Sequence, residues 1–275
     1  MVSTLVLPRL AAQKLSGQRS FSRVAAVTSR NLVAVRHSGY WLVVISGFLE
    51  PVLYLLSIGV GVGSLIKTFT LADGTVVSYA AFVAPAMLAA SAMNGAMAES
   101  TFNFFARMKW VKLYDAMVAT PLKPVEVALG ELGWALIRGA LYAVGFLGLM
   151  VALDLTTIGW AVMALPASLL VGFAFGSIGM AIATMLRTWR DFDIIAVIQF
   201  GLFLFSGTFV PIEAYPPAAR VIIEYTPLFQ SIELIRDITS GRPGVGTLLH
   251  AAYLVALAAV GLAIAGRRMG KILCR

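Results

Sequence analysis

Residues 158–186 read IGWAVMALPASLLVGFAFGSIGMAIATML, a run without a single charged side chain. A helix needs about 20 predominantly apolar residues to cross the hydrocarbon core of a bilayer, so this run predicts a transmembrane helix. The rest of the chain agrees, because its 275 residues are 60% hydrophobic and only 12% charged, with a mean hydropathy of +0.89. So few charged residues do not cover a globule in water, and the composition therefore predicts an all-α integral membrane protein.

Further apolar segments of comparable length raise the predicted number of transmembrane helices to about six. The predicted spans are residues 41–66, 80–106, 131–153, 158–186, 194–212 and 247–266.

The distribution of Lys and Arg predicts the orientation, since basic loops are retained on the cytoplasmic side of a membrane. With the N-terminus inside, the outside segments contain only Lys67, Arg220, Arg236 and Arg242, and every other basic residue falls on an inside segment. We therefore expect both termini in the cytoplasm. The net charge of +8 then reflects topology, and no nucleic-acid partner is needed to explain it.

Residues 1–40 form a basic segment without the uninterrupted apolar core of a signal peptide, so we expect it to remain on the mature protein. Within it apolar side chains recur at helical spacing, interleaved with arginines, which predicts an amphipathic helix in the cytoplasmic headgroup layer. A frayed basic tail is the alternative. The apolar positions are Phe21, Val24, Ala25, Leu32 and Val35.

Two polar segments are longer than simple turns. The inside loop 107–130 contains LYDAMVATPLKP, in which Asp115 and the Thr120-Pro121 pair can delimit a short surface helix. A partner protein can push against such a helix, so we expect this loop to be the coupling surface. Its candidate residues are Tyr114, Asp115, Thr120, Pro121 and Glu126.

The second polar segment, residues 211–246, is predicted to lie outside. It mixes apolar and charged side chains, so it is too polar to span the bilayer and too apolar to lie free in water. We expect one or two amphipathic helices, broken at Pro227, that re-enter the outer leaflet or rest on its surface before the last span.

Three ionisable residues fall inside predicted spans, where a charge is costly and is a functional candidate by default. Glu50 precedes Pro51 in the first span, and this kinked position is a candidate for the substrate route or the dimer seam. Glu99 and Arg138 lie at matching depths in the second and third spans, which predicts an intramembrane charge pair. The alternatives are that each side chain reaches the inner surface independently, or that Arg138 pairs with Glu131.

Gly172, Gly176 and Gly179 lie on one face of the fourth predicted span and form a G-x-x-x-G element. Small residues let helix backbones approach closely in a membrane, so another helix is predicted to pack on this face. Packing within the same subunit is the favoured interpretation.

Nothing in the sequence provides catalytic chemistry. A phosphate-binding loop requires G-x-x-x-x-G-K-[ST] after a strand, and no segment matches it. The single Cys274 and the two histidines, His37 and His250, lack metal-ligand spacing, so we expect no metal, cofactor or nucleotide site in this chain.

The order of several segments along nearly the whole chain resembles the permeases of ABC-2 type exporters, and in particular the nodulation-factor and daunorubicin-type exporter permeases. These segments are LEPVLYLLSIGVGVGSLI at 49–66, ATPLKP at 119–124, SGTFVPIE at 206–213 and TPLFQSIELIRDITSG at 226–241. The resemblance implies that residues 41–275 form one permease domain in the plasma (inner) membrane of a prokaryote. It also implies two partner ATPase subunits that bind ATP and Mg²⁺, and a second permease copy in a homodimer or heterodimer.

The implied function is ATP-driven export of an amphipathic lipid, a glycolipid or lipo-oligosaccharide, or a hydrophobic drug. A secondary, ion-coupled transporter is the alternative, although the internal repeats and paired broken helices of that class are not evident. An ABC importer is less favoured because its inside loop should carry an E-A-A-x-x-x-G pattern, which residues 126–130 do not follow. A membrane enzyme is least favoured, because the sequence has no cluster of catalytic side chains.

Overall fold

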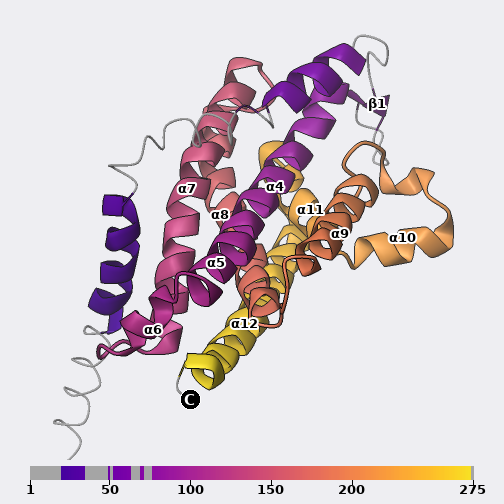
Figure 1. Cartoon of the computed structure of the whole chain (residues 1–275). Coiled ribbons are helices and arrows are strands. Elements are labelled where there is room, and N and C mark those ends of the chain that lie inside the picture. The colour runs from indigo at the N-terminus through magenta and orange to yellow at the C-terminus, as the bar shows by residue number, and fades with distance from the viewer. Residues whose placement is uncertain (1–19, 35–48, 50–51, 63–68, 71–75, 274–275) are drawn as a thin grey trace, which may run out of the picture.

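The computed structural model describes residues 20–34, 49, 52–62, 69–70 and 76–273, and within these it is mostly helical (Figure 1). Glu50 and Pro51, and the basic residues before Ser20, lie outside the described residues. The elements are a helix over residues 20–34, η1 (Leu55–Val62), β1 (Phe69–Thr70), β2 (Val76–Val77), α4 (Tyr79–Ala98), η2 (Glu99–Asn103), α5 (Phe104–Lys109), α6 (Leu113–Val118), α7 (Pro124–Ala152), α8 (Ile158–Ala183), α9 (Asp191–Phe205), η3 (Ile212–Ala214), α10 (Pro217–Glu224), α11 (Pro227–Thr239) and α12 (Val245–Leu273).

Four helices in the described part of the chain are long and apolar enough to cross a membrane. They are Tyr79–Lys109, which runs through α4, η2 and α5, then Pro124–Ala152, Ile158–Ala183 and Val245–Leu273. They correspond to four of the six predicted spans. The short strands β1 and β2 pair antiparallel before α4, so a small hairpin is added to the predicted all-α architecture.

The other two predicted spans are not established as crossings. The segment 41–66 is described only in part, and α9 ends at Phe205, well before the predicted boundary at residue 212. The helix stops there because the chain turns at Gly207, whose φ of +70° suits a glycine and interrupts helical geometry.

The inside loop predicted at 107–130 is mostly helical. The second span continues through Lys109, and α7 begins at Pro124, where a proline lacks an N–H that the first turn would leave unsatisfied anyway. The Glu126 carboxylate accepts a hydrogen bond of 3.0 Å from the Lys123 backbone N–H and so caps α7. Only the segment around α6 remains between the two long helices.

Helix α8 lies at the centre of the bundle and contacts α4, α7, α11 and α12. Its glycines make this possible, because a side chain there would meet the neighbouring helices. A Cβ added to Gly172 or Gly176 would contact α7 through Leu136 or Leu132, and one on Gly179 would collide with Ser100 on η2. The three predicted packing glycines therefore face other helices of the same chain.

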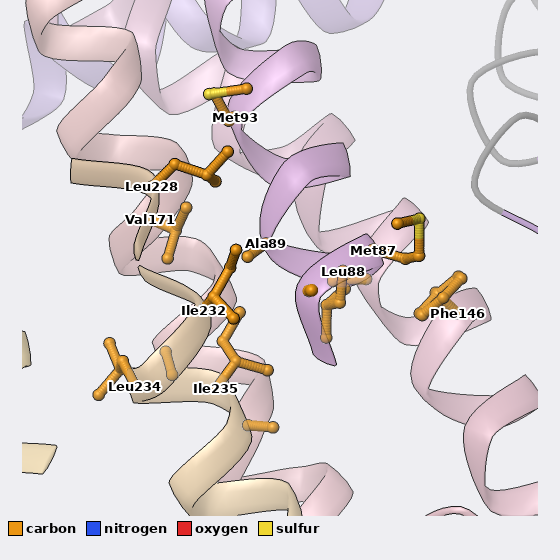
Figure 2. Packing of buried hydrophobic residues seen from close by; sticks show 14 of the residues in the cluster. Met87, Leu88, Ala89, Met93, Phe146, Val171, Leu228, Ile232, Leu234 and Ile235 are labelled. Carbon is orange, nitrogen blue, oxygen red and sulfur yellow. The ribbon is translucent and has the colours of Figure 1, made fainter. Parts of the chain in front are cut away.

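The polar segment 211–246 folds into two main helices, α10 and α11, separated at Thr226 and Pro227. Helix α11 is not a surface helix, because Leu228, Ile232 and Ile235 are completely buried against α4 and α8. Figure 2 shows these side chains pointing toward α4, on the opposite side of that helix from Phe146 of α7. Burial of this apolar face, at about 25 cal/mol per Å² of area removed from water, fixes α11 in the bundle.

Candidate functional site

The second membrane helix changes geometry at Glu99. From Glu99 to Asn103 it forms a wider, π-helical turn, and the Ser100 and Thr101 hydroxyls donate to carbonyl oxygens four residues earlier, at 2.7 and 2.6 Å. Side-chain hydroxyls that bond to such carbonyls bend helices, and π-helical turns recur at functional sites. The irregular helical geometry therefore marks the turn that begins at Glu99 as a candidate functional site.

Two carboxylates and three guanidinium groups meet at this turn. Arg138 Nη1 lies 2.5 Å from Glu99 Oε2, and Arg107 Nη2 lies 2.9 Å from Glu99 Oε1. Arg107 also donates to Glu131 on α7, and Arg30 from the helix 20–34 lies 3.5 Å from the same carboxylate. We refer to these five residues, Arg30, Glu99, Arg107, Glu131 and Arg138, as the charge cluster.

The carboxylates of the charge cluster are almost inaccessible, with side chains that are 3% exposed at Glu99 and 2% exposed at Glu131. A buried carboxylate without a partner would destabilise the fold by several kcal/mol, so these two depend on their arginines. Asn103 adds a hydrogen bond of 2.8 Å to Glu99. Among the described side chains the cluster contains three positive and two negative groups, which leaves a formal charge of +1.

Tyr114 connects the short helix α6 to the charge cluster. Its side chain is completely buried, and its ring packs 5.0 Å from that of Phe104 on α5. Burial, with a smaller contribution from the negative charge of Glu131, raises the pKa of Tyr114 well above its ordinary value. The tyrosine is therefore neutral at physiological pH and anchors α6 by packing.

The helix over residues 20–34 docks on the start of α7. Thr28 donates a hydrogen bond of 2.9 Å to the Gly130 carbonyl, Ser20 donates one of 2.7 Å to Glu126, and Arg23 lies 3.6 Å from Glu126. Gly130 permits this contact, because a Cβ there would come within 2.5 Å of Val27. Polar and small residues thus hold the N-terminal helix against the bundle, as its position beside α7 in Figure 1 shows.

The predicted apolar face of that helix is largely exposed, although Val24 is half-buried beside Gly130 and Val35 lies outside the described residues. Phe21 is 76% exposed and Leu32 is 53% exposed, whereas Val27 and Asn31 are buried on the docked side. Insertion of the exposed face into the headgroup layer remains a prediction.

The structure divides the five predicted coupling residues into two groups. Asp115, Thr120 and Pro121 are exposed at the end of the molecule where α6 and the C-terminal part of α12 meet (Figure 1). Tyr114 and Glu126 are buried, so they are not part of the exposed surface around α6, and their role in coupling remains a prediction. They hold α6 and the helix 20–34 in place.

Glu99 and Arg138 are brought together at the spacing of an ion pair. Whether the pair serves transport remains a prediction. The sequence did not predict that Arg30, Arg107 and Glu131 belong to one cluster with this pair. Arg107 and Glu131 fall at the ends of predicted spans, where charged residues are common, so their positions did not mark them as buried.

Comparison with known proteins gives matches over most of the chain. Residues 62–267 match a family described as ABC-2 family transporter protein. Nodulation protein J of Rhizobium leguminosarum bv. viciae is 32% identical over 250 residues, which cover 89% of this chain and 94% of that protein. Nodulation protein J of Rhizobium leguminosarum bv. trifolii is 34% identical over 233 residues, covering 83% of this chain and 86% of the relative.

Proposed function

We propose, because this chain belongs to the ABC-2 family of transporter proteins, that it is the permease subunit of an ATP-driven exporter. The chain then forms the translocation route, and a separate ATPase subunit binds ATP and Mg²⁺. Two ATPase copies and a second permease copy complete the proposed transporter. ATP hydrolysis drives transport only if motion of the ATPase is transmitted to the membrane helices.

The observation that carries this proposal is the position of α6. Its residue Asp115 is exposed, while the adjacent Tyr114 is buried against α5 close to Arg107. A partner that pushes on α6 therefore acts on the paired charges that hold α5, α7 and the helix 20–34 together. Paired buried charges suit a switch between discrete states. A buried charge that leaves one partner needs another, so the cluster is restricted to a few distinct pairings.

A second loop extends the proposed coupling surface. The Trp110 ring, which follows α5, lies 4.8 Å from that of Trp189, which precedes α9. Trp189 in turn packs 4.7 Å from Phe102 on η2. Residues 187–193 are therefore connected mechanically to the segment that leads into α6, and we assign the surface to both loops, with α6 as its centre.

We propose six crossings in a prokaryotic inner membrane, with both termini cytoplasmic. The two crossings beyond the four long helices are the segment that contains η1 and the helix α9. Support comes from α9, in which Ile195 is the only buried residue and large apolar side chains are exposed on several faces. Such a helix is stable in lipid or against a second permease copy, and it would be unfavourable in water.

For the substrate we propose an amphipathic lipo-oligosaccharide or glycolipid, and the relatives named nodulation protein J support this class over a hydrophobic drug. The test is reconstitution of the chain in liposomes with its proposed ABC ATPase partner, followed by measurement of ATP-dependent movement of labelled lipo-oligosaccharide. We expect export that stops when the catalytic glutamate of the ATPase is replaced by glutamine.

The control for this test is the isolated chain. Magnesium-dependent ATP hydrolysis by the chain alone, free of contaminating ATPase, would contradict the assignment. Movement driven by an ion gradient without the ATPase would instead favour a secondary transporter.

A further inference from the structure

A shallow groove lies between α4 and α7 on the membrane-spanning part of the molecule. Its walls carry small side chains, including Ser91, Ala92 and Gly95 from α4 and Gly139 and Ala143 from α7. Because these side chains are short, the two helices leave space that the chain itself does not fill.

One end of the groove is charged and the other is apolar. Arg138 and Glu99 line the first end together with Tyr142, whose hydroxyl accepts a hydrogen bond of 3.3 Å from Arg138 Nη2. Leu88 lines the other end. From Leu88 to Glu99 the helix rises by about 16 Å. This length is close to the depth of one leaflet, which is half of a hydrocarbon core about 30 Å thick.

The charge of the polar end favours an anion. Both oxygens of Glu99 already accept hydrogen bonds, Oε1 from Arg107 and Oε2 from Arg138 and Asn103, so its negative charge is shared among three donors. The cluster as a whole retains a formal charge of +1, and Arg138 is its only cationic member that lines the groove. A phosphate group forms charge-assisted hydrogen bonds with a guanidinium.

We propose that this groove binds one anionic phospholipid of the inner leaflet, with its phosphate at Arg138 and an acyl chain along the small residues toward Leu88. The site lies within one permease chain and does not depend on which substrate is exported. It rests on the proposed orientation, which places the charge cluster toward the cytoplasmic side. A lipid held there joins α4 to α7 directly beside the paired charges.

The experiment compares phosphatidylglycerol with phosphatidylcholine, using the purified full chain and native mass spectrometry to count bound lipids. Gly139→Leu fills the groove, and Gly148→Leu is the matched control on the same helix. A Cβ at either position meets no atom within 4 Å, so both variants are expected to fold. Arg138→Gln tests the charge separately.

We expect the wild-type chain to retain one phosphatidylglycerol about tenfold more tightly than phosphatidylcholine, the scale of one hydrogen bond to a charged group. Gly139→Leu should lose both lipids, and Gly148→Leu should behave as wild type. Arg138→Gln, if it folds, should lose only the preference for phosphatidylglycerol.

Equal retention of phosphatidylglycerol by Gly139→Leu and wild type would overturn the proposal. A change from dimer to monomer in Gly139→Leu, with lipid binding unchanged, would also overturn it, because the groove would then hold a helix of the second copy.

Discussion

Arg138 on α7 donates a hydrogen bond of 2.5 Å to the carboxylate of Glu99, thirty-nine positions earlier in the chain. Glu99 also accepts from Arg107, and Arg107 donates to Glu131, so the pair belongs to a longer chain of alternating charges. These contacts make the two partners unequal. Loss of Arg138 removes one of three donors to Glu99 and leaves Arg107 and Asn103 in place, whereas loss of the Glu99 charge weakens all three hydrogen bonds at once.

The first prediction follows from this inequality. We expect Glu99→Gln to lower the thermal midpoint of the purified chain more than Arg138→Gln does. The double variant should recover part of the loss, with a coupling on the order of 1–3 kcal/mol. The wild type, the two single variants and the double variant are heated in detergent. The fraction that remains folded is then measured by fluorescence-detected size-exclusion chromatography. Additive losses would show that the two side chains act independently.

The second prediction concerns the docking of the helix 20–34. Gly130→Ala should displace this helix from α7, because the added methyl would overlap Val27, and the thermal midpoint should fall. Gly148→Ala is the control, since its Cβ meets open space and alanine favours a helix by about 0.5–1 kcal/mol over glycine. Protease access to the N-terminal segment provides a second measurement. Equal behaviour of the two variants would contradict the tight contact.

The third prediction tests the coupling surface. In a Cys274→Ser background, cysteines at Asp115 or Thr120 should crosslink to the ATPase partner, because Asp115 is exposed on α6 and Thr120 is exposed just after it. A cysteine at Arg190 tests the second loop, and one at Val221 on α10 is the negative control. Crosslinking at Arg190 alone would move the centre of the surface to residues 187–193.

The fourth prediction is a pH dependence of the loop before α9. Asp191 accepts backbone hydrogen bonds from Thr188 and Arg187, at 3.0 and 2.8 Å, and these lower its pKa below the ordinary value of 3.8. A lowered pKa in the folded chain stabilises the loop above the ordinary pKa, and that contribution is lost as the pH falls through the lowered value.

Hydrogen exchange of the Arg187 and Thr188 amides measures this effect. We expect their protection, relative to an Asp191→Asn variant, to disappear only in acid below the ordinary pKa. Asp193→Asn serves as the control and should leave the dependence unchanged. A midpoint above the ordinary pKa would show that the backbone hydrogen bonds do not stabilise the ionised carboxylate.

Much of the architecture could be predicted from the sequence, because long apolar helices are dictated by local composition. The run at 158–186 became α8, and the segment 80–106 became a helix that ends three residues later, at Lys109. Ends were less predictable. Pro124 starts α7 earlier than the apolar pattern suggests, and Gly207 stops α9 earlier, because capping and turn residues act independently of hydropathy.

The burial of α11 could not be predicted from its composition. Its sequence mixes charged and apolar residues, which favours a surface helix, yet the apolar side fills the bundle beside α4 (Figure 2). Arg236 remains compatible with burial because it pairs with Glu233 and its guanidinium lies 4.2 Å from the centre of the Phe82 ring. Glu233 lies one turn away on the same helix, but Phe82 belongs to the distant helix α4, so the local sequence does not predict the contact with its ring.

The amino-acid sequence was sufficient to predict a helical, membrane-embedded chain, the similar depth of Glu99 and Arg138, and the small residues along one face of α8. These properties depend on composition and on the regular rise of a helix. The folded chain was needed to learn that Arg107 lies between two carboxylates, that Arg30 lies within ion-pair distance of Glu131, and that Tyr114 is buried. Hydropathy determines how deeply a residue lies in the membrane, whereas its partner depends on how each helix is rotated and packed.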